Sequence, residues 1–377
     1  MERLIFNHIQ QDLKEKIILL SGPRQVGKTT LAQSLHSNHS YLNYDVAEHR
    51  LIIEQNLWPK VVALVILDEL HKMKDWKRWL KGIYDLKKAS NNFGPNIIVT
   101  GSARLDIAKK MGDSLAGRHF SYRLNPLSIK ELAGSIPNAF DRLMEIGGFP
   151  EPFLKNDLTF YRKWQTSHID LILRQDLLDL EQVKLISKLE TLVELLRSRV
   201  GSPCSYSSLS RDLQVDDTTI KRWLRILEHL FIIFKIVPYH KNVARAVLKT
   251  PKYYFYDIGK VISDEGKRFE NLVALSLLSE IDFIKDTEGR KLNLNYLRNK
   301  EGNEIDFTIR EEEQITHAIE CKWTSNQPDK SFRVFFEKGK LKSNKYLQLM
   351  GQKTTSKEYP NGLKVLSAEK WLKEINL

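Results

Sequence analysis

Residues Gly22–Thr29 read GPRQVGKT, which matches the pattern G-x-x-x-x-G-K-[ST] at every fixed position. Glycines at these places let the backbone curl, so that successive N–H groups point at one anion. The apolar run Ile17–Leu20 precedes the loop and a helical pattern begins near Lys28, so the loop joins a strand to a helix. A glycine-rich turn without a ligand is the alternative, but the strand–loop–helix context favours a phosphate-binding P-loop.

This predicted P-loop assigns roles to its own residues and to the first turn of the helix. Lys28 is expected to reach the β- and γ-phosphates of ATP, and the Thr29 hydroxyl is expected to ligate Mg²⁺. ATP and Mg²⁺ are therefore the predicted ligands. The residues expected to surround the nucleotide are Gly22, Pro23, Arg24, Gln25, Val26, Gly27, Lys28, Thr29 and Thr30.

An acidic pair follows a second buried strand, as ATP hydrolysis by a P-loop protein requires. The apolar run Val61–Leu67 ends at Asp68 and Glu69. Asp68 is expected to help hold Mg²⁺, and Glu69 to polarise the attacking water as a catalytic residue, with Lys28 stabilising the transferred phosphoryl group. A strand end with two solvated carboxylates is the alternative, which the upstream P-loop disfavours.

The fold class follows from three short apolar runs that alternate with helical patterns. The third run, Ile97–Val99, ends at Thr100, Gly101 and Ser102. This alternation predicts an α/β fold with a parallel sheet, helices on both faces, and a ligand site at the carboxyl ends of the strands. A hydroxyl after the third strand would hydrogen-bond the γ-phosphate or the attacking water, and we favour Ser102 over Thr100.

The order of the motifs resembles a large family of bacterial and archaeal AAA-type ATPases, over almost the whole chain. After the P-loop come LDE at 67–69, TGS at 100–102, LAGR at 115–118 and GGFP at 147–150. Family members carry a C-terminal domain of unknown function, often with a restriction-endonuclease-like fold. The resemblance implies that Ser102 is the polar sensor of an AAA-type active site.

An arginine follows Gly117 in the LAGR segment. In an oligomeric ATPase, Arg118 would be the arginine finger that stabilises transition-state charge, supplied by the same or a neighbouring subunit. Arg104 is a weaker candidate for that role. A lone surface arginine is the alternative, so a homo-oligomer with Arg118 acting in trans stays an expectation.

Composition indicates the compartment and the class of partner. The formal net charge of +12 and the pI near 9.4 favour a polyanionic partner, with DNA as the first candidate, although a lysine-rich proteome would give the same balance. Cys204 and Cys321 have neither metal-ligand spacing nor a disulfide framework, which fits a reducing cytosol. Residues 1–16 lack an apolar signal core, and no apolar run is long enough to span a membrane. We expect a cytoplasmic protein.

A helix-turn-helix pattern lies in the middle of the chain. Residues 207–213 are expected to be a short helix, and residues 218–230 a second helix capped by Asp217 or Thr218. Wing strands are expected at 231–237 and 253–256. This arrangement predicts a winged helix that contacts DNA, and a purely structural packing module is the alternative.

Three carboxylates and a lysine suggest a second metal site. Asp306 lies on an alternating strand, Glu320 and Lys322 share one face of the next strand, and Glu270 lies on an upstream helix. The carboxylates would hold Mg²⁺ or Mn²⁺ against a scissile phosphate, and Lys322 would act as a catalytic residue that orients water. The set is similar to the PD-(D/E)XK nuclease core, although Ile305 stands in place of the proline of some relatives. A salt-bridged face inherited from a nuclease ancestor is the alternative.

These patterns predict three domains: an AAA-type P-loop ATPase at 1–150, a helical linker with a winged helix at 151–252, and an α/β nuclease-like domain at 253–377. The leading interpretation is an ATPase that acts on DNA through its winged helix and a metal-dependent nuclease-like domain. The first rival is a non-nucleolytic ATP switch whose C-terminal half binds DNA or a protein partner. The second is a C-terminal half that packs structurally and regulates the ATPase.

Overall fold

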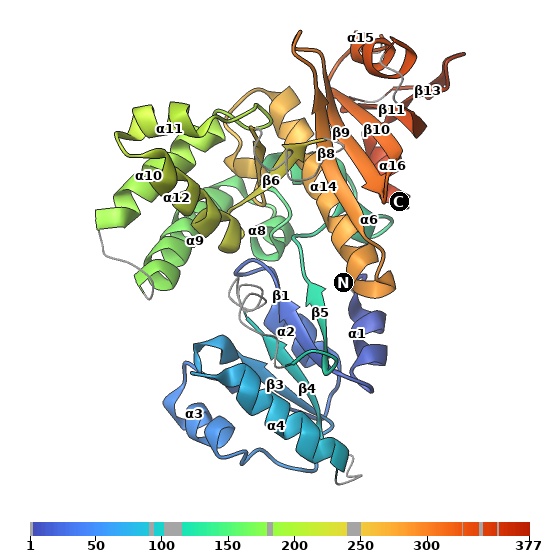
Figure 1. Ribbon diagram of the computed structural model, residues 1–377. Helices are drawn as coiled ribbons and strands as arrows, with labels where there is room; N and C mark the ends of the chain where they lie inside the picture. Colours follow the sequence, from blue (N-terminus) through green and yellow to red (C-terminus); the bar gives the residue numbers. More distant parts are fainter. Residues whose placement is uncertain are drawn as a thin grey trace. The chain divides into compact units, whose positions relative to one another are not determined.

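The computed structural model describes residues 3–377 apart from 90–93, 102–114, 179–183, 240–249, 326, 339–341 and 353. The chain divides into two compact units (Figure 1). The first comprises Met1–Asn125 with Asp286–Glu288, and the second comprises Pro126–Lys285 with Gly289–Leu377. The first unit ends before the ATPase boundary predicted at residue 150.

A five-stranded sheet forms the centre of the first unit, with strand order β2-β3-β4-β1-β5 and parallel neighbours throughout. This confirms the predicted α/β fold with a parallel sheet. β4 lies between β1 and β3, so the end of β4 lies between the P-loop and the acidic pair. The strands are β1 (Ile17–Ser21), β2 (His39–Asn43), β3 (Leu64–Asp68), β4 (Asn96–Thr100) and β5 (His119–Arg123).

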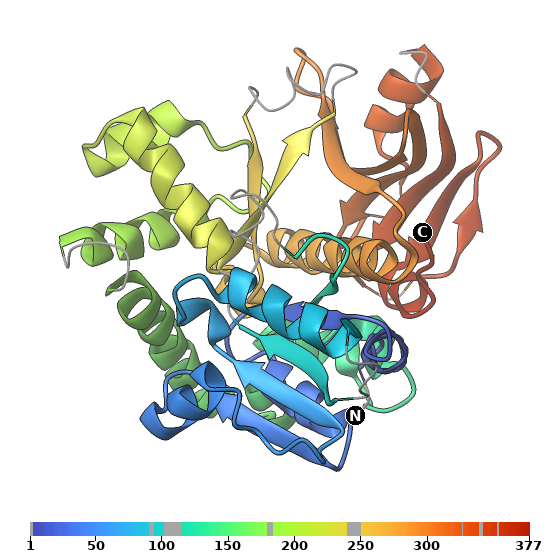
Figure 2. The same cartoon turned by 60° about the horizontal axis from the view of Figure 1, so that its bottom comes forward.

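Both faces of this sheet are buried. Val65 and Val99 point to one face, where they share a core with Leu80 of α4, and Ile66 and Ile98 on the opposite face are also fully buried. Figure 2 shows α4 lying along the sheet. The helices are α1 (Phe6–Asp12), α2 (Lys28–Ser34), α3 (Ala47–Glu54), η1 (Leu70–Lys72) and α4 (Trp76–Ala89).

An eight-stranded mixed sheet dominates the second unit, with strand order β12-β13-β11-β10-β9-β8-β6-β7. The long helix α14 (Glu265–Glu288) packs on it, because Phe269 and Leu277 share a core with Phe307 and Ile319. The strands are β6 (Ile233–Pro238), β7 (Lys252–Phe255), β8 (Leu292–Arg298), β9 (Glu304–Glu311), β10 (Gln314–Lys322), β11 (Ser343–Met350), β12 (Lys357–Glu358) and β13 (Leu363–Ser367).

Helices fill the rest of the second unit. They are α6 (Ile129–Leu132), α7 (Ala139–Ile146), α8 (Pro150–Lys155), α9 (Leu158–Leu178), α10 (Lys184–Arg197), α11 (Tyr206–Leu213), α12 (Asp217–His229), η3 (Ile258–Lys260), α15 (Lys330–Phe332), η4 (Arg333–Lys338) and α16 (Ala368–Lys373). The helix-turn-helix pair is therefore present as α11 and α12. Asp216 caps α12 by accepting a hydrogen bond from the Thr219 amide, one residue before the predicted caps.

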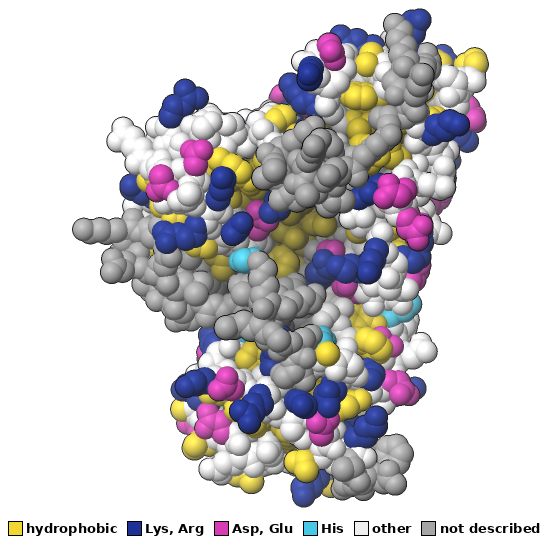
Figure 3. Space-filling view, in the orientation of Figure 1, with side chains coloured by type: hydrophobic (Ala, Val, Ile, Leu, Met, Phe, Trp, Pro, Cys, Tyr) yellow, Lys and Arg dark blue, Asp and Glu magenta, His cyan; other side chains and the backbone are white. Residues whose placement is uncertain are grey.

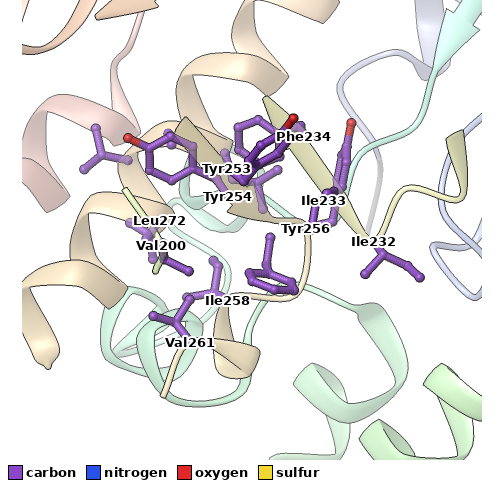
Figure 4. Packing of buried hydrophobic residues seen from close by; sticks show 14 of the residues in the cluster. Val200, Ile232, Ile233, Phe234, Tyr253, Tyr254, Tyr256, Ile258, Val261 and Leu272 are labelled. Atoms are coloured by element: carbon purple, nitrogen blue, oxygen red, sulfur yellow. The ribbon is translucent and has the colours of Figure 1, made fainter. Parts of the chain in front are cut away.

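One core joins the two segments that were predicted as separate domains after residue 150. Figure 4 shows Val200, β6 and β7 residues such as Phe234 and Tyr254, and Leu272 of α14 packed together. The boundary predicted between residues 252 and 253 falls inside β7, which pairs with β6. β6 in turn pairs with β8 at Val237, so both segments contribute to one sheet.

Candidate functional site

At two positions, the loop after β1 has a backbone conformation that favours glycine. Gly22 has a φ of +151°, and a Cβ there would clash with the Leu124 carbonyl oxygen. Gly27 has a φ of +96° at the N-cap of α2. The buried Lys28 ammonium donates hydrogen bonds of 3.0 Å and 2.7 Å to the carbonyl oxygens of Gly22 and Pro23. These bonds hold the Lys28 ammonium against the start of the loop, on the side where a P-loop lysine contacts the phosphates.

Asp68 is held at the end of β3 by donors from four directions. Its Oδ2 accepts hydrogen bonds from the Thr29 hydroxyl at 3.0 Å and the Tyr41 hydroxyl at 2.9 Å. Its Oδ1 accepts from the Thr100 hydroxyl at 2.6 Å and the Glu69 amide at 3.1 Å. Asp68 itself is 8% exposed. The structure thus brings the two predicted Mg²⁺ ligands, Thr29 and Asp68, into direct contact.

These residues fit a Mg²⁺ ion, because the metal prefers a few carboxylate and hydroxyl oxygens together with substrate phosphates. The side chains that contact Asp68 are neutral hydroxyls. Each donates a hydrogen bond to the carboxylate, and a hydroxyl can rotate away from the carboxylate without leaving a charge unpaired. An oxygen-rich site beside the lysine of a P-loop is the donor set that a nucleotide-bound magnesium ion uses.

Glu69 lies beside Asp68 in a left-handed conformation with a φ of +54°. Burial, reinforced by the negative charge of Asp68, raises the pKa of the Glu69 carboxyl. Its Oε2 lies 3.6 Å from His71 Nε2 and 4.0 Å from Lys72 Nζ. A buried carboxylate with a raised pKa is a stronger base than an exposed one, which suits it to accept a proton from water.

The remaining predicted nucleotide contacts line the same loop. Val26 is fully buried, while Arg24 is half-buried and Gln25 is exposed with a φ of +60°. Thr30 is exposed on the first turn of α2. Ser102 and Arg104 lie outside the described residues, and Thr100 is the hydroxyl that the structure brings to Asp68.

Arg118 does not lie near the P-loop of its own chain. Its carbonyl oxygen accepts a hydrogen bond from the Ile17 amide, at the amino end of β1, whereas the P-loop follows the carboxyl end. Its guanidinium forms an ion pair with Asp85 at 2.7 Å. Only a neighbouring subunit's P-loop is compatible with the arginine-finger hypothesis, which stays a prediction.

Sequence reasoning missed Tyr41, the partner of Asp68 on β2. The strand reads HSYLN, so it lacks the apolar run that marks β1, β3 and β4. Its position depends on the pairing of Asn43 with Asp68, which places Tyr41 close to the strand end. A polar edge strand of this kind leaves no periodic signal that would have identified it.

The predicted nuclease-like residues also come together, in the second unit. Asp306 on β9 donates its amide to Glu320 Oε2 at 3.3 Å, and Glu320 Oε1 pairs with Lys322 Nζ at 2.9 Å. Glu270 on α14 joins them through Lys252, whose Nζ lies 3.3 Å from Glu270 Oε1 and 3.7 Å from Asp306 Oδ1. Sequence reasoning missed Lys252, which is 0% exposed.

The donor set of this cluster does not fit a divalent metal ion. The Lys252 ammonium already lies among the carboxylates of Glu270, Glu304 and Asp306. Burial alone would lower the Lys252 pKa, but the three carboxylates raise it overall, so the lysine stays charged. Among the described residues, no group of three or more His, Cys, Asp or Glu side chains is arranged to hold a metal.

Two acids of the cluster, Asp306 and Glu320, have raised pKa values. Burial alone would raise the pKa of Glu270 as well, but Lys252 and Lys267 lower it overall. Burial, with the nearby charge of Glu270, raises the pKa of Asp306 to about 6. Burial and the neighbouring Asp306 raise the pKa of Glu320 well above its ordinary value. Lys322, the predicted catalytic lysine, forms a second ion pair with Asp329 at 2.8 Å. Lys322 is therefore held between two acids.

Basic side chains cover the exposed face of α12. Lys221, Arg222 and Arg225 are exposed, and with Thr218 and His229 they line a shallow hollow. Lys and Arg side chains gather over this part of the second unit in Figure 3. The apolar residues of α12 point the other way, into the core. This amphipathic arrangement leaves a cationic helix face toward solvent.

No helix in the described part of the chain has both the length and the apolar character needed to cross a membrane.

Family models match three consecutive parts of the chain. Residues 14–133 match an AAA domain, residues 137–263 a domain of unknown function (DUF8612), and residues 265–371 another domain of unknown function (DUF4143). An uncharacterized protein of Mycobacterium tuberculosis is 27% identical over 247 residues, which is 64% of this chain. The chain thus spans about half, 54%, of that relative's length. An uncharacterized protein of Haemophilus influenzae is 22% identical over 415 residues, with 97% of each covered.

Solved structures of low similarity include a RuvB variant and an Orc1 protein. A RuvB variant from Thermotoga maritima is 17% identical, with a TM-score of 0.32 over 62% of this chain and 86% of that chain. Orc1 from Aeropyrum pernix, solved in complex with DNA, is 12% identical, with a TM-score of 0.31 over 71% of this chain and 91% of that chain. The residues that match an AAA domain, 14–133, are thus the ones that carry the P-loop geometry, and residues 265–371 match the domain of unknown function DUF4143.

Proposed function

We propose that this chain binds ATP with Mg²⁺ at its P-loop and hydrolyses it. The observation that carries the proposal is the direct hydrogen bond between Thr29 and Asp68, the two residues that would hold the metal. Mg²⁺ when bound neutralises phosphate charge and orients the phosphates. Lys28, already held across the loop, is positioned to exchange its carbonyl partners for phosphate oxygens.

Glu69 supplies the base in this proposal. Its carboxylate, with a pKa raised by burial and by Asp68, accepts a proton from the water that attacks the terminal phosphorus. Thr100 anchors Asp68 from the neighbouring strand and fixes the direction of the carboxylate. Arg118 of an adjacent copy of the chain would complete the charge stabilisation in a homo-oligomer.

DNA is the partner that the second unit fits best. Lys221, Arg222 and Arg225 form an exposed cationic face on the second helix of a helix-turn-helix pair, which β6 and β7 follow as an antiparallel hairpin. Asp216 and Asp217 at the start of the helix repel phosphate, so the contact is with the middle of α12. This arrangement supports our proposal of a winged helix that binds the DNA backbone and of ATP turnover that responds to it.

Cleavage of DNA at Asp306, Glu320 and Lys322 is not part of the proposal. The Lys252 ammonium lies among the carboxylates of Glu270, Glu304 and Asp306, and Lys322 pairs with Glu320, so the donor set does not fit a catalytic metal. The proposed activity is therefore the non-nucleolytic one: an ATP-driven switch whose second unit binds DNA.

A paired assay tests both parts of this proposal. We expect the steady-state ATPase rate of the wild type to rise with added DNA, and Lys28→Ala to lose hydrolysis with and without DNA. The double variant Lys221→Glu/Arg225→Glu should keep the basal rate and lose the DNA response. The control is the exposed pair Arg162 and Lys163 on α9, whose reversal to glutamate should leave the response intact. Hydrolysis that persists in Lys28→Ala refutes the ATPase assignment, and a DNA response shared by both double variants and the wild type refutes the α12 contact.

A further inference from the structure

Lys252 is the fully buried cation of the second unit's sheet. It opens β7 and its ammonium faces three carboxylates: Glu304 Oε1 at 2.5 Å, Glu270 Oε1 at 3.3 Å and Asp306 Oδ1 at 3.7 Å. It also lies 5.2 Å from the centre of the Tyr296 ring, on the aromatic face that attracts cations. A lysine is almost never fully buried unless it is paired, and here the pairing is threefold.

The carboxylates around Lys252 have their own fixed partners. Glu270 accepts hydrogen bonds from the Tyr254 hydroxyl at 2.7 Å and from Lys267 Nζ at 2.8 Å. The chain also packs tightly on this acid, because a Cβ added at Gly201, where φ is +65°, would lie 2.5 Å from Glu270 Oε1. On the other side, Asp306 Oδ2 accepts a hydrogen bond from the Cys321 amide at 2.9 Å. Glu270 and Asp306 are therefore each held in place by protein donors as well as by Lys252.

The distances explain why a metal ion and Lys252 exclude each other. A Mg²⁺ ion needs carboxylate oxygens about 2.1 Å away in near-octahedral geometry, with several ligands brought together on one ion. An ammonium in the same space contributes a positive charge that repels a dication in a poorly screened interior. A metal ion that took the place of the Lys252 ammonium would separate this buried ammonium from its carboxylate partners. A buried ammonium without a partner is strongly destabilising.

We propose that Lys252 takes the place of a divalent metal ion in this cluster, so that Glu270, Glu304 and Asp306 form a metal-free structural clamp. The clamp joins β7, α14 and β9, which supply the lysine and the three acids. The inference is independent of the ATP proposal above and rests on the same Lys252 contacts that exclude DNA cleavage from the proposed function. It predicts a domain whose stability depends on an internal lysine and not on metal.

Thermal unfolding of Lys252→Met tests the clamp. Methionine keeps the length of the side chain and removes the charge, which leaves the buried carboxylates of Glu270 and Asp306 and the partly exposed carboxylate of Glu304 without their shared cation. Breaking a buried ion pair on one side is strongly destabilising, so the unfolding temperature of the second unit should fall by roughly 10 °C. The matched control is Lys267→Met, because Lys267 pairs with the same Glu270 but is partly exposed, and its loss should lower the temperature by only a few degrees.

The double variant Lys252→Met/Glu304→Gln keeps the test informative if the single variant fails to fold. Glu304 makes the shortest contact with Lys252, so removing both charges should restore part of the lost stability, although Glu270 and Asp306 stay without their cation and Arg298 loses its pair with Glu304. A Lys252→Met protein as stable as the wild type would overturn the clamp. A double variant that is less stable than Lys252→Met alone would overturn the pairing with Glu304.

Metal binding is measured separately on the nucleotide-free full chain. Any rise in the unfolding temperature that Mn²⁺ causes in the wild type should be absent in Thr29→Ala, since the only metal site we assign includes Thr29. Electron paramagnetic resonance of added Mn²⁺ should likewise show no bound ion in Thr29→Ala. A bound Mn²⁺ ion in Thr29→Ala that is lost on adding Asp306→Asn would overturn the inference. These readouts do not depend on ATP turnover, so a failure here is distinguishable from a failure of the ATPase proposal.

Discussion

Asp68→Asn is the substitution whose consequence follows most directly from the geometry. The Asp68 carboxylate accepts four hydrogen bonds, from Thr29, Tyr41, Thr100 and the Glu69 amide. An asparagine side chain keeps one acceptor oxygen and replaces the other by an N–H₂ donor. Two of the four groups that donate hydrogen bonds to Asp68 then face the N–H₂ group of the asparagine, although one of the hydroxyls can rotate and accept a hydrogen bond from it.

The magnitude comes from the bonds that change. A hydrogen bond to a charged group contributes about 1.5–3 kcal/mol to stability, and a neutral one about 1 kcal/mol. Losing one bond to the Asp68 carboxylate and weakening the others removes about 4 kcal/mol, and relief of the buried charge returns part of that. The free energy of unfolding of the first unit should therefore fall by about 2–3 kcal/mol in Asp68→Asn, with no nucleotide or metal present.

The assay must report on the first unit alone. Hydrogen exchange with mass spectrometry on peptides from β3 and β4, in EDTA and without nucleotide, gives the local free energy of opening. Asp45→Asn is the control, because Asp45 pairs with Lys72 at an exposed site and its loss should change stability by less than about 1 kcal/mol. Equal exchange in Asp68→Asn and the wild type would refute the structural role of the Asp68 contacts, and undiminished ATP turnover in the same variant would remove Asp68 from the metal site.

Further substitutions separate chemistry from binding. Glu69→Gln should bind ATP normally and slow turnover about 10²–10⁴-fold, because it removes the general base. In the wild type, the ATPase rate should fall as the pH is lowered, because Glu69 must be deprotonated to accept a proton from water. The fall should begin at a higher pH than for an ordinary glutamate, since the Glu69 pKa is raised. A Glu69→Gln variant whose rate equals that of the wild type and does not change from pH 5 to 8 would contradict the assignment. Lys221→Glu/Arg225→Glu should reduce the slope of log affinity for DNA against log salt by about 2, and an unchanged slope would exclude phosphate contacts by these residues. Arg118→Ala should lose activity that is partly restored by mixing with inactive Lys28→Ala subunits, and a mixture with no recovered activity would argue against a finger acting in trans.

Sequence alone predicts the centre of the first unit because the physical signals there are local. β1, β3 and β4 are buried on both faces, so each is a nearly continuous apolar run, and the P-loop pattern fixes where α2 begins. β2 and β5 read HSYLN and HFSYR and form the edges of the sheet. Their exposure removes the apolar signal, and with β2 the hydroxyl of Tyr41 was also missed.

The second unit was harder to predict because its structure depends on contacts between distant residues. A lone lysine before the aromatic run Tyr253–Tyr256 has the appearance of a linker, and the predicted boundary was placed beside it. Lys252 is buried because Glu270 on α14 and Glu304 and Asp306 on β9 converge on it. No local pattern records that convergence. The contacts of Glu320 with Asp306 and with Lys322, by contrast, were predicted from strand alternation.

The two acidic sites of the chain differ in the partners that their carboxylates have, and this difference separates chemistry from structure. Asp68 is bonded by neutral hydroxyls of Thr29, Tyr41 and Thr100, which can reorient without leaving a charge unpaired. A metal ion can therefore replace a proton donor there at little electrostatic cost. The acids around Lys252 face a fixed ammonium instead, and displacing it would bury an uncompensated charge. Carboxylates of the same kind thus favour metal-dependent turnover in the first unit and a permanent ion cluster in the second.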